Sequence, residues 1–351
     1  MITPAHRRFV LMRLVRLAVG FSFVAAACSP GEEVVPRASP PSAEPSPAEA
    51  IETPSPKPED SPPSPLARSA ARVWVAVEDA GRVVLVDVER EKVLRRVPVP
   101  GSPHNLTVEG GIVVAALQAA GSVVLVNGRR VTDVELGGSP HDVKAMGDRV
   151  VVANEGSARV DVLSTDGERL GSVDLSANPH DLALTPDGRT AWVTLDATDR
   201  IAIVDLEDLA VRRYVPTGRR PHDILVAPDG RVWVTDWGGA LHVLSGRGEI
   251  TKSIPLGVEA HHLAFTPDGR ECWIVDHGAH RVFVLDVGTL EVLARLSIHG
   301  APHHVAITAD GRFAAVADHD NGTVMVFDVG RRRPVGEVPV GPGPHGVWAV
   351  T

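Results

Sequence analysis

Histidine recurs at regular intervals from residue 104 to the end of the chain, at His104, His141, His180, His222, His261, His303 and His345. Proline precedes each of these except His261, which follows Ala260. A second histidine, His262 or His304, directly follows two of the seven. Neutral imidazole is the commonest protein ligand for transition metals. A structure that brought these side chains together would form a metal site, and we predict copper or zinc as the ion.

A second set of polar residues recurs between these histidines, each at the end of a short apolar segment. Asp236, Asp276 and Asp318 hold this position in three consecutive units, and His277 and His319 follow two of them. Carboxylates ligate metals or orient the second nitrogen of a ligating histidine. We therefore add these five side chains to the nine histidines in the predicted metal-binding set. The two sets are densest over the last three units, where we expect the site.

The repeated histidine also has a purely structural interpretation. Duplication copies a residue whether or not it carries chemistry. An imidazole beside proline can simply hydrogen-bond the backbone of a neighbouring unit and hold a loop in place. The sequence alone leaves both interpretations open.

The spacing of the histidines indicates the elements that position them. Successive members are separated by 37 to 42 residues, and a period of about 40 residues is typical of a four-stranded propeller blade. In the unit at residues 179–218, apolar and polar residues alternate first, and the Thr-Pro-Asp-Gly sequence of residues 185–188 suits a hairpin turn. Further strands are predicted at residues 191–193, 201–205 and 211–215.

The two ends of the repeat region predict how the fold closes. The repeats begin with a second strand at residues 73–77, and they end with a lone Pro-His strand at residues 344–350. Pairing of these two strands would close the ring without leaving a bare sheet edge. We therefore predict an all-β fold, a seven-bladed β-propeller closed by pairing of the C-terminal strand with the N-terminal blade.

The repeat units resemble a known family. The Pro-His entry, the TPDG turns, the VWVTD segment at residues 232–236 and the VFVLD segment at residues 282–286 are similar to the YVTN repeats of bacterial extracytoplasmic propellers, the YncE-like group. The resemblance covers residues 72–351. It implies the propeller fold and an extracytoplasmic location, but it implies no particular activity because such propellers host unrelated functions.

The beginning of the chain has the features of an export signal. Arg7 and Arg8 belong to a basic segment, an apolar segment follows from Leu17, and small residues precede Cys28. The apolar segment is too short to span a bilayer as a helix. Small residues before a cysteine resemble the bacterial lipobox, in which that cysteine is acylated. We predict that residues 1–27 are a lipoprotein signal peptide and that Cys28 is lipidated; a plain secretory signal is the alternative.

The segment after the signal differs from the repeats. Residues 28–68 are rich in proline, serine and glutamate, so they cannot form an apolar core and are expected to be a disordered tether. Residues 69–351 are then the propeller. The expected location is extracytoplasmic, with the lipid anchoring the protein to the outer face of the bacterial cell membrane or to the periplasmic side of an envelope membrane.

The composition and the motifs narrow the classes of function that we expect. The net charge of −9 argues against a nucleic-acid partner, and we expect a monomer. We favour a propeller that binds a metal ion or small ligand at a histidine-rich channel mouth. The alternatives are a surface scaffold for protein–protein interaction, with a purely structural histidine ring, and a metal-dependent lactonase- or lyase-like enzyme. No catalytic residues are assigned because no nucleophile or acid–base pair stands out, which favours binding over catalysis.

The lipid anchor leads to a first testable prediction. Replacing Cys28 with alanine removes the acylated thiol, so the exported protein should move from the membrane fraction to the soluble fraction. Cell fractionation followed by immunoblotting measures this change, and replacement of Ser29 by alanine serves as the control. A Cys28→Ala protein that remains as membrane-bound as the parent would contradict the anchor.

Overall fold

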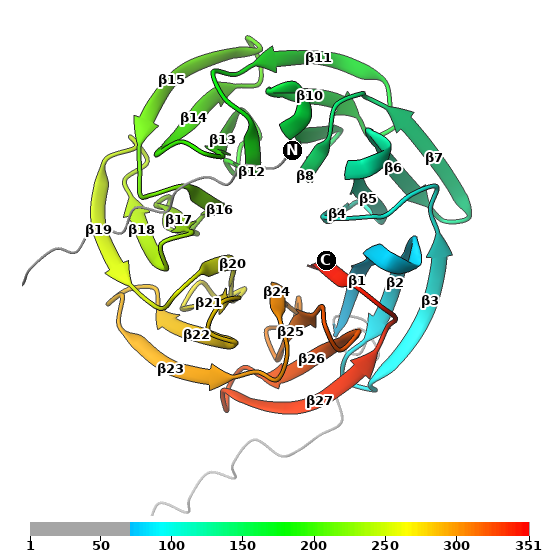
Figure 1. Ribbon diagram of the computed structural model, residues 1–351, viewed down its shortest axis with the longest axis vertical. Helices are drawn as coiled ribbons and strands as arrows, with labels where there is room; N and C mark the ends of the chain where they lie inside the picture. The colour runs from blue at the N-terminus through cyan, green and yellow to red at the C-terminus, as the bar shows by residue number, and fades with distance from the viewer. Residues whose placement is uncertain (1–70, 351) are drawn as a thin grey trace, which may run out of the picture. The chain divides into compact units, whose positions relative to one another are not determined.

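The computed structural model describes residues 71–350, in which seven four-stranded antiparallel sheets are arranged around a central axis (Figure 1). This confirms the predicted seven-bladed propeller. The innermost strands are β4 (Leu106–Glu109), β8 (Pro140–Met146), β12 (Pro179–Leu184), β16 (Pro221–Val226), β20 (Ala260–Phe265), β24 (Pro302–Ile307) and β28 (Pro344–Ala349). The second strands are β1 (Arg72–Val77), β5 (Ile112–Leu117), β9 (Arg149–Asn154), β13 (Thr190–Leu195), β17 (Val232–Asp236), β21 (Glu271–Asp276) and β25 (Phe313–Asp318).

The outer half of each blade completes the sheet. The third strands are β2 (Arg82–Asp87), β6 (Ser122–Asn127), β10 (Arg159–Ser164), β14 (Arg200–Asp205), β18 (Ala240–Leu244), β22 (Arg281–Asp286) and β26 (Thr323–Asp328). The fourth strands are β3 (Lys92–Pro98), β7 (Arg130–Glu135), β11 (Arg169–Asp174), β15 (Ala210–Pro216), β19 (Ile250–Pro255), β23 (Val292–Ser297) and β27 (Arg333–Pro339). Three single-turn 3₁₀ helices, η1 (Glu78–Ala80), η2 (Gln118–Ala120) and η3 (Glu155–Ser157), follow second strands in the described part of the chain.

The burial of the strands explains their composition. The second strands are covered on both faces by neighbouring blades, so β5 reads IVVAAL and is buried from its second residue onward. The outermost strands have one face in water and alternate accordingly, as β3 does. The core lies between blades: one cluster joins Val75 and Val84 to Ala315 and Val326 of the preceding blade in the ring.

The C-terminal strand completes the N-terminal blade, as the sequence predicts. β28 pairs antiparallel with β1, with Val347 opposite Val75 and Trp348 opposite Trp74. The sheet order β28-β1-β2-β3 therefore contains both ends of the described chain. This pairing removes the bare edge that β1 would otherwise present in the centre of the ring.

The predicted turns are also present. In the turn at residues 185–188, Gly188 has φ of +68°, and its amide donates to the Thr185 carbonyl at 2.8 Å. The Thr185 hydroxyl donates to Asp187 at 2.6 Å. This left-handed conformation favours glycine, which explains the Asp-Gly pair at the end of the motif.

The predicted signal peptide (residues 1–27), the lipidated Cys28 and the tether (residues 28–68) lie outside the described residues. None of the helices in residues 71–350 has the length and apolar character needed to cross a bilayer.

Candidate metal centre

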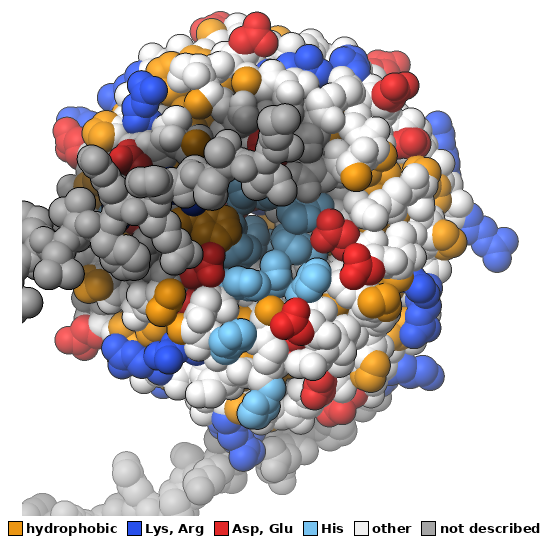
Figure 2. Space-filling view, in the orientation of Figure 1, with side chains coloured by type: hydrophobic (Ala, Val, Ile, Leu, Met, Phe, Trp, Pro, Cys, Tyr) orange, Lys and Arg blue, Asp and Glu red, His pale blue; other side chains and the backbone are white. Residues whose placement is uncertain are grey.

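The seven repeated histidines form a closed ring around the axis. Six of them are the second residue of an innermost strand, and His104 lies two residues before β4. These strands all run in the same direction, so their first residues meet at one end of the propeller. Consecutive imidazole rings are 3.8 to 5.5 Å apart between centroids around the whole circle. Figure 2 shows histidine side chains gathered in the central hollow. The hollow is a cavity of about 200 Å³ lined by the seven ring histidines, His262 and Trp237.

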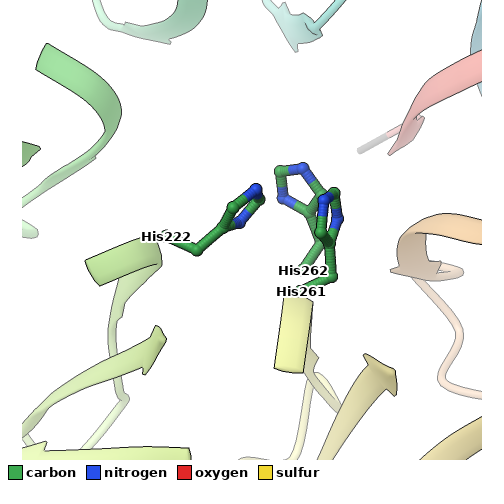
Figure 3. A group of neighbouring side chains, drawn as sticks. All are labelled: His222, His261 and His262. Atoms are coloured by element: carbon green, nitrogen blue, oxygen red, sulfur yellow. The ribbon is translucent and has the colours of Figure 1, made fainter. Parts of the chain in front are cut away.

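A break in strand register lets two consecutive residues reach the centre. In β20, Ala260 pairs with Asp276 and Leu263 pairs with Ile274, so His261 and His262 together stand opposite one residue of β21, Val275. An irregularity of this kind re-aims side chains that would otherwise alternate between faces. Figure 3 shows both imidazoles, from one strand, projecting toward the same space as His222.

Threonines on the second strands hold these bulges in place. The Thr235 hydroxyl accepts from the Asp223 amide at 3.1 Å and donates to the His261 carbonyl of the next blade at 2.6 Å. Thr194 makes the equivalent pair of contacts, with the Asp181 amide and the His222 carbonyl. Adjacent blades are therefore tied together directly behind the ring, which fixes the positions of the imidazoles.

A second layer of polar side chains lies below the ring. It contains His262 and His304, whose rings are 4.1 Å apart, and three carboxylates, Asp142, Asp181 and Asp223, with Lys144 and Asn105. All of these are buried. The Lys144 ammonium lies 2.6 and 2.7 Å from the two oxygens of Asp142, so this ion pair neutralises one of the three carboxylates.

Asp181 is the anionic centre of the site. Its oxygens lie 3.2 Å from Nδ1 of His180, 3.4 Å from Nδ1 of His141 and 3.6 Å from Nδ1 of His222. Burial by itself would raise the pKa of Asp181, but the neighbouring His180 and His141 lower it well below its usual range. Burial lowers the pKa of His180 as well, but Asp181 more than offsets this and raises it.

Asp223 has the opposite protonation preference. Burial and the nearby charge of Asp181 raise the pKa of Asp223 to about 8, although Lys144 opposes the shift. One of its oxygens accepts from the Leu263 amide of the next blade at 2.9 Å. At neutral pH the layer therefore combines an ionised Asp181 with a largely protonated Asp223.

Most of the ring imidazoles are held neutral. Burial, reinforced by the neighbouring imidazoles, lowers the pKa of His303 to about 2. Burial likewise lowers the pKa of His261 and His304 to about 3. It lowers the pKa of His222, His262 and His345 well below the usual range. Neutral imidazole is the form that ligates metals.

Three groups of side chains in the described residues bring their ligand atoms within 4.8 Å of one another: His222, His261 and His262; His141, His180 and Asp181; and Asp181, Asp223 and His262. These groups could hold a metal ion. In the first group, Nδ1 of His261 lies 3.0 Å from the His303 carbonyl, which directs the Nε2 lone pair away from the backbone. Nε2 of His262 has no hydrogen-bond partner among the described residues. Nδ1 of His262 lies 3.3 Å from a carboxyl oxygen of Asp223, and Nδ1 of His222 lies beyond hydrogen-bond distance of Asp181.

The second group is better explained as a hydrogen-bonded cluster. Nδ1 of His141 faces the His180 carbonyl at 3.0 Å, and a carbonyl only accepts, so that nitrogen carries a proton. Nδ1 of His180 faces the Asp181 carboxylate at 3.2 Å. Asp181 therefore orients the imidazole of His180 by this contact, as carboxylates often do beside histidines.

The structure separates the remaining predicted residues into two sets. His104, His303, His304 and His345 lie in or below the ring, and His277 and His319 flank it, with rings 4.4 and 4.8 Å from that of His303. The three predicted carboxylates serve the loops instead. Asp236 binds His242 Nε2 at 2.9 Å and the Ala240 amide. Asp276 accepts from the Val258 and Glu259 amides, and Asp318 from Asn321.

The carboxylates of the second layer were not among the predicted residues. The signal that could have identified them is the tripeptide Pro-His-Asp, which recurs at Asp142, Asp181 and Asp223 in three consecutive blades. Strict alternation would place the residue after each histidine on the opposite face of the strand. Only the register breaks of the innermost strands bring both residues to the axis.

A family model, the YNCE-like beta-propeller, matches residues 147–351. This match spans more than half of the chain. The chain belongs to the YNCE-like propeller family. No curated protein sequence matches it significantly.

Solved structures share the fold at low sequence identity. Hydrazine synthase from Kuenenia stuttgartiensis matches with a TM-score of 0.67 and 20% identity, covering 74% of this chain and 93% of that one. The dihydro-heme d1 dehydrogenase NirN matches with a TM-score of 0.62 and 17% identity, covering 80% and 75%. Virginiamycin B lyase from Staphylococcus aureus matches with a TM-score of 0.63 and 17% identity, covering 71% and 88%. At these identities the likeness shows the fold alone.

Proposed function

We propose that this YNCE-like propeller is an exported, lipid-anchored protein that binds a transition-metal ion at His222, His261 and His262, with copper or zinc as the ion. The observation that carries the proposal is the convergence of three buried, neutral imidazoles, of which His222 and His262 each have a buried ring nitrogen without a hydrogen bond. A buried polar atom without a partner is costly. A bound cation would take one nitrogen of each imidazole and offset part of that cost.

The donor set suits the proposed ions. Imidazole nitrogens favour zinc, copper, iron and nickel over magnesium or calcium, which prefer oxygen ligands. Three protein ligands leave a coordination position for water or a small ligand. The cavity of about 200 Å³ above the three histidines has room for such a molecule. A bound ion would act there as a Lewis acid toward that molecule.

The second candidate function is a lyase, and it rests on the shared fold alone. One matching structure is a catalytically inactive histidine-to-alanine variant of virginiamycin B lyase from Staphylococcus aureus with quinupristin, at 18% identity. Incubation of the metal-loaded protein with quinupristin, followed by mass spectrometry, tests this candidate. An unchanged substrate leaves the binding function as the proposal for this protein.

The metal site is tested by paired double variants. We expect His222→Ala/His262→Ala to lose one zinc or copper ion per chain, with affinity reduced by at least ~100-fold, because two of three ligands are removed. The matched control is His303→Ala/His304→Ala, an adjacent pair that belongs to none of the three converging groups in the described residues. Elemental analysis and isothermal titration calorimetry measure stoichiometry and affinity.

Two results would contradict the proposal. The first is a metal-treated parent protein that carries no stoichiometric ion after desalting. The second is equal binding by the parent and the His222→Ala/His262→Ala variant. Either result would favour the scaffold with a structural histidine ring. Because burial lowers the pKa of His261 to about 3, binding should persist at pH 6, where an exposed imidazole site loses affinity.

A further inference from the structure

Two ring histidines on the other side of the cavity face each other through the same nitrogen. Nε2 of His104 lies 3.1 Å from Nε2 of His141. Both side chains line the central cavity, and neither belongs to the group formed by His222, His261 and His262. What lies between the two nitrogens depends on where the protons of each imidazole are.

The second nitrogen of each ring faces an acceptor. Nδ1 of His141 lies 3.0 Å from the His180 carbonyl, and Nδ1 of His104 lies 3.4 Å from Oε1 of Glu78. A carbonyl and a carboxylate only accept, so both imidazoles carry their proton on Nδ1. In their neutral forms, His104 and His141 therefore direct two lone pairs at each other across 3.1 Å, an arrangement that is repulsive unless a cation lies between them.

The distance suits two ligands of one metal ion. Zinc–nitrogen bonds of 2.0–2.1 Å at a tetrahedral angle place two ligating nitrogens ~3.3 Å apart. Glu78 and the His180 carbonyl occupy the places that outer-layer partners of ligating histidines take, since they fix the tautomer and raise the basicity of Nε2. Both features of a metal-ligating pair, converging lone pairs and fixed tautomers, are thus present.

We propose a second transition-metal site in which Nε2 of His104 and Nε2 of His141 ligate one ion, with Glu78 as the outer-layer carboxylate. It rests on the proposed function, since it makes the centre a two-ion site around one cavity. The two imidazoles leave the remaining coordination positions open to the cavity of about 200 Å³. Water or a small anion from solution would fill them, so this ion is the more exchangeable of the two.

Zinc titration of the metal-free full-length chain tests the second site. We expect two ions per chain in the parent, one in His104→Ala/His141→Ala, one in His222→Ala/His262→Ala and none in the quadruple variant. The conservative test is Glu78→Gln, which should weaken only the second binding event, by 10–100-fold. Its matched control is Glu155→Gln. Glu155 stands at the same position of η3 as Glu78 does of η1, but its carboxylate accepts from Gln118 at 3.1 Å.

The outcomes separate the two proposals. One ion in the parent, lost in His222→Ala/His262→Ala and unaffected by Glu78→Gln, overturns the second site and keeps the first. The pair would then share a proton instead of a metal. One ion that is lost only in His104→Ala/His141→Ala overturns the first site and keeps the second. Circular dichroism of each variant checks that the blades remain folded, and the two glutamate variants remain informative if an alanine pair unfolds the chain.

Discussion

A chain that lacks residues 344–351 should lose the stability of the whole propeller. Removal of β28 takes away the partner of β1 and exposes Val75 and Trp74, which face Val347 and Trp348 in the intact sheet. Burial of two large apolar side chains, with the backbone pairing around them, stabilises the fold by roughly 5 kcal/mol. For a domain of this size we expect the melting temperature to fall by roughly 10–20 °C, or the protein to aggregate through the bare β1 edge.

A transposed chain is the control for this prediction. Residues 341–350 can be moved in front of residue 71 through a Thr-Pro-Asp-Gly turn like that at residues 185–188, because Ala349 already pairs with Val73 at the start of β1. This variant restores the strand with ordinary hairpin connectivity and should melt like the parent. Thermal unfolding followed by circular dichroism measures both variants. A truncated chain that melts with the parent would show that closure contributes little.

Metal-free protein should lose stability steeply as the pH falls below 6.5. The folded pKa is about 3 for His261 and His304 and about 2 for His303, whereas an unfolded histidine has a pKa of about 6.5. At pH values between the folded and the unfolded pKa, the unfolded chain binds more protons than the folded protein. The stability that these three groups contribute is therefore complete above the unfolded pKa and is lost as the pH falls toward the folded pKa.

The free energy of unfolding should change steeply with pH. Each such histidine contributes about 1.4 kcal/mol per pH unit in this window. Asp223 acts in the opposite direction: its folded pKa of about 8 lies above the unfolded value, so its contribution is complete below the unfolded pKa and is lost as the pH rises toward 8. For these four groups, three histidines against one carboxyl leave a net loss of about 3 kcal/mol per pH unit, enough to unfold a typical domain between pH 6 and pH 4. His222, His262 and His345, whose pKa burial also lowers, act in the same direction as the three histidines.

Chemical denaturation at several pH values, in the presence of a chelator, measures this slope. Replacing His303 with glutamine removes one titrating group and should make the slope shallower by about 1.4 kcal/mol per pH unit. The same replacement at the exposed His299 should leave it unchanged because no buried group is removed. Stability that is independent of pH between 6.5 and 4.5 would mean that the channel imidazoles are solvated, contrary to their burial.

The fold could be predicted from the sequence because propeller blades are local. The 37- to 42-residue spacing, the Thr-Pro-Asp-Gly turns and the alternating segments each involve residues that are close together in the chain. The strands predicted at residues 191–193, 201–205 and 211–215 lie within β13, β14 and β15. Closure was also predictable, since the repeats begin with a second strand and end with a lone Pro-His strand, which became β1 and β28 of one sheet.

The site was predictable only in part. The sequence by itself determined that seven histidines occupy one structural position, because a repeat places equivalent residues at equivalent places. It could not determine which of them converge. That depends on the register breaks that turn His262, Asp181 and Asp223 toward the axis, and on contacts between blades such as that from His261 to the His303 carbonyl. The contacts join residues of different blades, and only the closed ring brings those residues together.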